Sequence, residues 1–156
     1  MEEIEKLLRP DEILLTIDCR SLNQMIAAGN YGWVQPGINS LNFPWPEELN
    51  GRTIKRIVKI LNPGKFLDGF ETESYVKGNG YEPGSFLELL GLGVVRPELQ
   101  RQFHIAAPGT VWQPGGNYGY MTDLRGLSGQ RALCLLWLGA RLGPGYCLLG
   151  SRPLPD

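Results

Sequence analysis

His104 and three cysteines are the residues best suited to nucleophilic chemistry. A thiolate needs a base within hydrogen-bond reach, so His104 would have to lie beside Cys134 or Cys147. Both cysteines occur in apolar, strand-like runs, where burial keeps a thiol protonated, and His104 stands between two apolar residues. The sequence therefore favours three reduced, buried thiols, those of Cys19, Cys134 and Cys147, over a catalytic Cys–His pair. Cys134 and Cys147 are expected on neighbouring strands, where a cross-strand pair is sterically allowed.

Carboxylates offer a second kind of chemistry, because hydrolases hold two of them in one cleft. Glu71 and Glu73 are interpreted as solvated surface acids, whereas Asp18 ends an apolar strand. Asp18 could face a cleft, but a cap for the helix that begins at Ser21 is the favoured role. The sequence has no Cys-x-x-Cys pair and a single histidine. We therefore expect no metal site, no cofactor and no assigned catalytic residue.

Two glycine-rich segments, Gly91-Leu-Gly93 and Gly115-Gly-Asn-Tyr-Gly119, superficially suggest phosphate binding. The dinucleotide fingerprint needs a strand before the glycines and a helix after them. Gly91 or Gly93 is instead predicted to end a helix, and Gly115-Gly116 to join two strands. Both segments are therefore interpreted as turns.

An aromatic hairpin is the feature that points most directly to binding. A turn at Gly115-Gly116 places Trp112 opposite Gly119, with Tyr118 and Tyr120 on the other face of the hairpin. Trp112 is then expected in the core, and the tyrosine face is the best candidate for contact with a ligand. The candidate ligand-binding residues of this face are Gln113, Tyr118 and Tyr120.

A second group of aromatic residues lies in the loop-rich stretch 30–51. Prolines on both sides of Trp45 oppose a regular element there. Rings in such a segment more often pin a long loop to the core than line a site. Tyr31 and Trp33 are kept as further candidate ligand-binding residues.

The elements that position these residues are strands and short helices in the first two thirds of the chain. A strand is predicted at 12–19, followed by a helix whose capping box is Ser21 and Gln24. The segment 52–61 combines helical spacing with many β-branched residues, and we predict a strand. If it were a helix it would be cationic and amphipathic, which would suggest a membrane surface or nucleic acid. Further helices are expected over 2–8, 71–77, from Ser85 to Gly91 or Gly93, and over 97–102.

Strand-length runs separated by glycine and proline turns follow residue 103. Because their connections are short, these strands are expected to form an antiparallel meander. The predicted fold class is α+β, with short N-terminal strand–helix units followed by an antiparallel β-meander in the C-terminal third. The length of 156 residues suits a single globular domain over 1–156. The expected strands are 103–107, 109–113, 117–122, 131–138 and 145–151.

Composition limits the partners. Hydrophobic residues make up 42% of the chain and charged residues 20%, as in globular proteins. A net charge of −1 makes nucleic acid an unfavourable partner. No apolar run is long enough to span a membrane, and the acidic start lacks the core of a signal peptide, so a cytoplasmic location is expected. Another protein, a small ligand or a second copy of the chain are the partners that stay open.

Three motifs resemble a family of uncharacterised bacterial proteins. They are a Pro-x-Ser/Thr-x-x-Glu-Leu-Leu helix at Pro83–Leu90, Leu-Gln-Arg-x-Phe at Leu99–Phe103, and Gly-Ser/Thr-Val-Trp at Gly109–Trp112. The segments 25–34 and 42–44 are similar to that family too. The family has no assigned activity, so the resemblance implies a bacterial, cytoplasmic, single-domain protein and imports no catalytic residue.

The second half is also similar, at the level of fold alone, to C-type-lectin-like and sulfatase-modifying modules. The last strand, 145–152, lacks the arginine that those modules place just after the aromatic residue. Their calcium ligands and their catalytic cysteine pair have no visible equivalent here.

The sequence favours a non-enzymatic binding or interaction module. One alternative is a small hydrolase or transferase with an unidentified cysteine or carboxylate site. The other is a structural protein that forms oligomers through the apolar strands 133–138 and 147–149.

Overall fold

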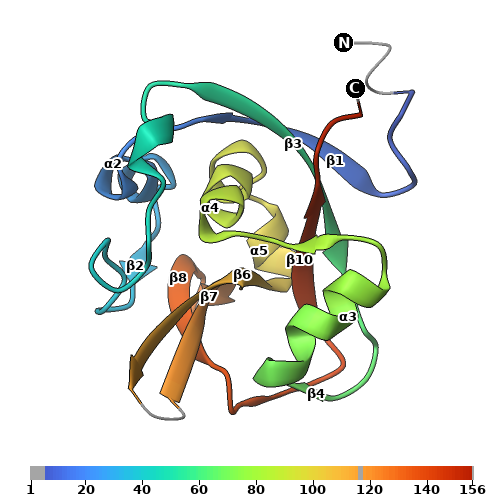
Figure 1. Cartoon of the computed structure of the whole chain (residues 1–156). Coiled ribbons are helices and arrows are strands. Elements are labelled where there is room, and N and C mark those ends of the chain that lie inside the picture. The colour runs from blue at the N-terminus through green and yellow to red at the C-terminus, as the bar shows by residue number, and fades with distance from the viewer. Residues whose placement is uncertain (1–5, 116–117, 156) are drawn as a thin grey trace.

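A mixed β-sheet curves around one buried helix, α4, in the computed structural model, which describes residues 6–115 and 118–155 (Figure 1). Helices make up 23% of the chain and strands 41%, so the fold is mainly β with some helices. The elements are β1 (Glu12–Asp18), α2 (Leu22–Ala28), β2 (Trp33–Val34), η1 (Glu47–Leu49), β3 (Thr53–Leu61), β4 (Leu67–Asp68), η2 (Gly69–Glu71), α3 (Thr72–Gly78), β5 (Glu82–Pro83), α4 (Phe86–Val95), α5 (Leu99–Gln102), β6 (His104–Gly115), β7 (Tyr118–Leu127), β8 (Gln130–Trp137), β9 (Arg141–Leu142) and β10 (Tyr146–Arg152).

The strands of the large sheet follow the order β1-β3-β10-β6-β7-β8-β2, and β5 pairs with β10. The predicted antiparallel meander is confirmed for β6, β7 and β8. The predicted strands 103–107 and 109–113 are instead one strand, β6, with register shifts along it. It is wrong for the last strand, because β10 lies between β3 and β6 and runs parallel to β6. The run Cys147–Ser151 is buried on both faces, which suits a central strand better than a meander edge.

The first half of the chain folds largely as its local signals predict. β1 occupies the predicted window, and Ser21 and Gln24 form the capping box that begins α2. The segment 52–61 is a strand, β3, which excludes the cationic amphipathic helix. β3 pairs with β1 on one side and β10 on the other, so its β-branched residues pack on both faces of a sheet. The helix expected over 2–8 lies mostly outside the described residues.

Helix α4 does not end at Gly91 or Gly93 as predicted but continues to Val95. Its residues from Phe86 to Gly93 are all buried, so packing overrides the low helix propensity of glycine. A Cβ atom at Gly91 would lie 2.8 Å from the Ile17 side chain. The glycines therefore allow the close approach of α4 to its neighbours.

The sheet separates two hydrophobic clusters. The larger cluster, which includes Leu15, Leu90 and Leu133, fills the space between α2, α4 and the concave face of the sheet. The smaller cluster, which includes Val76 and Leu148, lies under α3 and the two-stranded β4–β9 sheet. No helix in the described part of the chain is long and apolar enough to cross a membrane.

A buried ion pair joins β1, the first strand along the chain, to β10, the last. Arg152 donates from Nε and Nη2 to the two carboxylate oxygens of Glu12, at 2.9 and 2.7 Å. The Tyr81 hydroxyl donates to the same carboxylate at 2.6 Å. The hydrogen bonds from Arg152 outweigh the cost of burial and lower the pKa of Glu12 from 4.5 to about 2.

We expect this carboxylate to make stability depend on pH in the acid range. A lowered folded-state pKa contributes stability that is fully present above the unfolded value, near 4.5, and is lost as the pH falls towards 2. Urea unfolding between pH 6 and pH 2 should therefore show a loss of about 2–3 kcal/mol from Glu12. The Glu12→Gln variant should be less stable than the parent protein at neutral pH, and its stability should fall less as the pH is lowered. If its stability fell with pH as steeply as that of the parent protein, the assignment to Glu12 would be contradicted.

Candidate functional site

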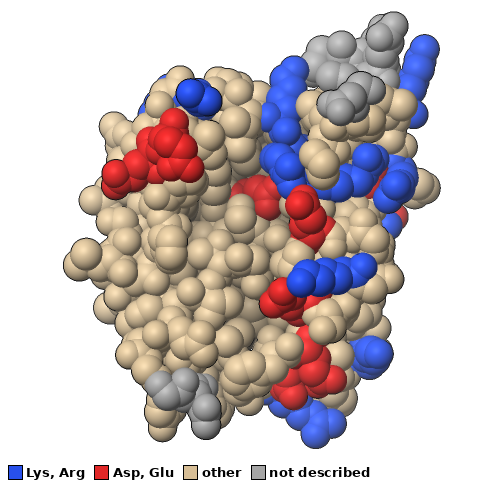
Figure 2. Space-filling model, in the orientation of Figure 1, with Lys and Arg blue, Asp and Glu red and all other residues tan. Residues whose placement is uncertain are grey.

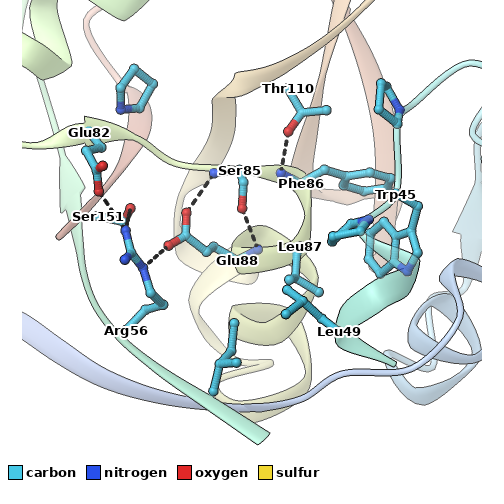
Figure 3. A pocket seen from close by; sticks show the side chains of 14 residues that line it. Trp45, Leu49, Arg56, Glu82, Ser85, Phe86, Leu87, Glu88, Thr110 and Ser151 are labelled. Carbon is cyan, nitrogen blue, oxygen red and sulfur yellow. Dashed lines mark hydrogen bonds and ion pairs between the residues drawn. The ribbon is translucent and has the colours of Figure 1, made fainter. Parts of the chain in front are cut away.

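A groove of about 410 Å³ opens at the N-terminal end of α4 (Figure 3). Figure 2 shows the hollow near the middle of this face of the molecule, with acidic atoms inside it. The groove has the volume of a small-molecule site. Its lining comes from η1 and the loop before it, β3, β5, the cap and first turn of α4, β6 and β10: Pro44, Trp45, Pro46, Leu49, Ile54, Arg56, Glu82, Pro83, Ser85, Phe86, Leu87, Glu88, Thr110 and Ser151.

One wall of the groove is apolar and is built around Trp45. The Trp45 indole Nε1 donates to the Arg20 carbonyl oxygen at 2.9 Å. Its ring packs edge-on against Phe86, with centroids 5.8 Å apart. Leu49 completes this wall opposite the first turn of α4 (Figure 3). The indole is therefore held in place before any ligand arrives.

The opposite end of the groove is charged. Arg56 donates from Nε to Glu88 at 2.8 Å, and from Nη2 to Glu82 at 2.7 Å and to the Ser151 hydroxyl at 3.1 Å. Burial alone would lower the pKa of the Arg56 guanidinium, but its hydrogen bonds to the two carboxylates raise it. Two carboxylates against one guanidinium leave this end with a formal charge of −1. The Glu82 side chain is 63% exposed and can therefore reach a ligand.

The floor of the groove is the capped first turn of α4. Ser85 and Glu88 form the predicted capping box, in which each side chain accepts the other residue's backbone N–H. The Thr110 hydroxyl oxygen accepts the Phe86 N–H at 3.0 Å (Figure 3). Glu88 thus joins the helix cap to Arg56, and the polar groups of the floor are fixed by hydrogen bonds.

The surface beside the groove is without charge over a wide area. The segments 21–46, 103–122 and 132–140 contain no Lys, Arg, Asp or Glu. They meet in the fold because β2 pairs with β8 and Gly37 packs against Trp112 and Leu135. Figure 2 shows this surface as the uncharged part at the left and below the hollow.

The aromatic hairpin does not have the predicted register. Gly115 pairs with Tyr118, so Gly115 belongs to the strand, and the rest of the predicted turn lies outside the described residues. Trp112 pairs with Tyr120 rather than with Gly119, and the two rings are in contact at 5.5 Å on the same face. Two register shifts separate Ala107 from Trp112 and Trp112 from Gly115, and each contains a proline, which cannot donate to the ladder.

The structure separates the candidate ligand-binding residues into two places. Gln113 and Tyr118 are exposed at the hairpin, and Tyr120 is half-buried against Trp112. Trp33 is exposed too, but at another place along β8. Trp33 pairs with Ala132, near the start of β8, whereas Tyr120 pairs with Trp137, at its end.

Tyr31 is half-buried, and its hydroxyl is buried. Its ring stacks on the Arg131 guanidinium at 4.9 Å, and burial raises the pKa of its hydroxyl to about 12. Among the residues named from the sequence, Gln113, Tyr118 and Trp33 are therefore the exposed ones.

We expect truncation of the hairpin aromatics to have graded effects on stability. Trp112→Ala should cost about 3 kcal/mol, because the half-buried indole packs against Phe43 and Tyr120. Tyr120→Ala should cost about 1–2 kcal/mol and Tyr118→Ala less than about 1 kcal/mol, since Tyr118 is 62% exposed. Urea denaturation of the three variants measures this order. A loss at Tyr118 as large as that at Trp112 would contradict the packing described.

The candidate nucleophiles do not come together. Cys134 and Cys147 are not on neighbouring strands as predicted, because β6 and β7 lie between β8 and β10. Burial, followed by the nearby Asp123 carboxylate, raises the pKa of Cys134 to about 11, and burial also raises the pKa of Cys147. His104 packs edge-on against Tyr146 at 5.4 Å. Both thiols are therefore held in their protonated form.

The candidate carboxylates have structural partners. Asp18 does not cap α2, because Ser21 does so; Asp18 accepts instead from the Thr53 hydroxyl at 2.8 Å. Glu71 completes a capping box with Asp68, and Glu73 pairs with Lys77 one helical turn away. The described residues contain no group of three or more His, Cys, Asp or Glu that could hold a metal ion.

Two buried polar groups were not found from the sequence. The Asp123 carboxylate has no exposed surface and accepts from Arg125 at 2.7 Å and from the Tyr146 hydroxyl. Arg131 donates to backbone carbonyl oxygens of Gly29, Gly93 and Pro97. An isolated Asp or Arg in a strand carries no local signal of such partners, which are distant in sequence.

No family model, no curated protein and no solved structure matched the chain when it was compared with each.

Proposed function

We propose that the protein is a non-enzymatic binding module whose site is the groove at the start of α4. The observation that carries the proposal is the arrangement of a fixed aromatic wall opposite a charged end within one small groove. Trp45 offers a ring face and edge for an apolar body, and the Arg56–Glu82–Glu88 group offers polar contacts for a head group. The family resemblance assigns no residue a role, so the proposal rests on the groove.

The charges at the polar end favour a cationic or strongly donating head group. Both Glu88 oxygens already accept hydrogen bonds, from Ser85 and Arg56. Glu82 uses one oxygen for Arg56, and its side chain is largely exposed, which makes its carboxylate the natural partner of a ligand ammonium. The ligand class is therefore a small aromatic amine, or an exposed side chain of the same chemistry.

A pair of probes with the same phenylethyl frame tests this proposal. Phenethylamine carries an ammonium group where phenylpropionate carries a carboxylate. Isothermal titration should show phenethylamine binding at least about 10-fold more tightly, a difference of about 1.4 kcal/mol. If the two probes bound with equal affinity, or if neither bound, the proposal that the groove binds amines would be contradicted.

Variants locate the binding on the groove. Glu82→Gln should weaken phenethylamine about 5-fold, because it removes the negative charge opposite the ammonium group. Glu98→Gln is the matched control, since Glu98 is also an exposed acid paired with an arginine, Arg96, at 2.7 Å. That variant should bind as the parent protein does. Trp45→Ala should weaken both probes, because it removes the apolar wall.

A further inference from the structure

Strand β1 forms one edge of the large sheet and leaves part of its backbone without a partner strand. Within the described residues, β3 is the only strand that pairs with β1. The Cys19 N–H donates to the Arg52 carbonyl oxygen, on the β3 side. Because residues of an antiparallel strand alternate in direction, Ile13, Leu15 and Ile17 also bond towards β3. The N–H and C=O groups of Leu14 and Thr16 therefore point away from the sheet.

A cleft of about 310 Å³, partly apolar and lined also by Asp18, Arg20 and Gln24, lies directly beside this edge. Three successive residues of β1, 16–18, line it together with α2 and the C-terminal part of α4. Val94 and Val95 of α4 are 41% and 45% exposed there, although most of α4 is buried. The edge and the cleft are continuous, so a strand added to β1 would also cover these valines.

The edge lacks the features that usually prevent pairing. Natural edge strands carry lysine, proline or a bulge, or are very short. β1 has seven residues, Glu-Ile-Leu-Leu-Thr-Ile-Asp, and pairs with β3 without a register shift. Its only uncompensated charge is Asp18, at one end, because Glu12 is neutralised by Arg152.

We propose that a second copy of this chain occupies the edge, by antiparallel pairing of β1 with β1 about a two-fold axis. When the axis passes through Leu15, Leu14 of one copy faces Thr16 of the other, and their outward N–H and C=O groups satisfy each other. Ile13 of each copy then faces Ile17 of the other, at the mouth of the cleft. Ile13 is only half-buried in the single chain, so the same contact covers it and the exposed valines.

The strand is self-complementary in this register. Asp18 of one copy comes opposite Glu12 of the other, and that carboxylate carries Arg152 with it. The isolated acid therefore meets an ion pair rather than a bare charge. The interface is small, so we expect a reversible dimer with a dissociation constant in the micromolar range.

Two substitutions at Thr16 test the pairing in the full-length protein. Thr16→Pro removes an outward N–H and leaves the bonds to β3 intact, and Thr16→Lys places a charge on the edge. Sedimentation velocity should show the parent chain as a dimer at high concentration and both variants at least about 10-fold weaker in association. Ser74→Lys is the control, since Ser74 is exposed on α3, and it should dimerise as the parent does.

Amide hydrogen exchange places the interface. In the dimer the amides of Leu14 and Thr16 should become protected as concentration rises, while those of Leu15 and Ile17 are protected at all concentrations. A parent chain that stays monomeric up to about 1 mM would overturn the proposal. So would a dimer in which the Leu14 and Thr16 amides exchange freely. Thr16 does not line the groove at α4, so phenethylamine binding is unaffected by either result.

Discussion

Arg131→Ala should destabilise the protein by about 3–5 kcal/mol. The side chain lies within β8 and donates to Pro97 at 3.1 Å, to Gly93 at 2.7 Å and to the Gly29 carbonyl oxygen. Gly29 caps α2, and Gly93 lies in the last turn of α4. The guanidinium therefore satisfies the carbonyl ends of two helices, where a positive charge is also favoured by the helix dipoles.

The loss follows from what alanine leaves behind. The carbonyl groups lose their donor inside the protein, where water does not replace it freely, and the Tyr31 ring loses the cation stacked on it. Arg131→Lys keeps the charge but not the planar fork of donors, so an intermediate loss is expected. Urea unfolding at neutral pH measures both variants.

Arg101→Ala is the matched control for this prediction. Arg101 also donates to a backbone carbonyl oxygen, that of Gly129, at 3.2 Å, but it is exposed. Its removal should cost less than about 1 kcal/mol. Equal losses for the two arginines would show that Arg131 does not hold the helix ends.

Gly109→Ala should be comparably destabilising, by about 3 kcal/mol or more. A Cβ atom at this position would lie 2.4 Å from the Pro83 carbonyl oxygen and 2.7 Å from that of Gly84. Both contacts are to backbone, so no side-chain rotation relieves them. The strand β6 must move away from residues 83–84, and the hydrogen bond from the Gly109 N–H to the Gly84 oxygen, 2.8 Å long, is lost.

The same substitution should also reduce binding in the groove. Pro83 lines the groove, and Thr110, the next residue in β6, holds the Phe86 N–H. Gly145→Ala is the control, because a Cβ atom there meets no described atom within 4 Å. That variant should change stability by less than about 1 kcal/mol. A Gly109→Ala protein with parental stability would contradict the close approach of β6 to β5.

The parts of the fold that the sequence predicted are those with local signals. The capping boxes at Ser21 and Ser85 begin helices as expected, because the residues that form each box are three apart. The β-branched residues of 52–61 outweighed their helical spacing, since β3 lies between two strands. β10 lies between β3 and β6, which are about 90 and about 40 residues away from it in sequence, and no local signal marks that position.

The candidate groove was not predictable for the same reason. Trp45, Arg56, Glu82 and Glu88 come from separate elements, and only the cap role of Glu88 was visible in the sequence. The hairpin register was missed because β6 has extra residues at the two register shifts, each of which contains a proline that cannot donate to the ladder.

The central claim, that the groove at the start of α4 binds a small aromatic amine, is tested most directly by nuclear magnetic resonance. Phenethylamine added to ¹⁵N-labelled protein should shift the backbone amides of Phe86 and Leu87 and the indole N–H of Trp45, which all line the groove. The same amounts of phenylpropionate should leave them nearly unchanged, and Glu82→Gln should reduce the shifts. Saturable shifts confined to residues outside the groove, or identical responses to amine and acid, would contradict the account.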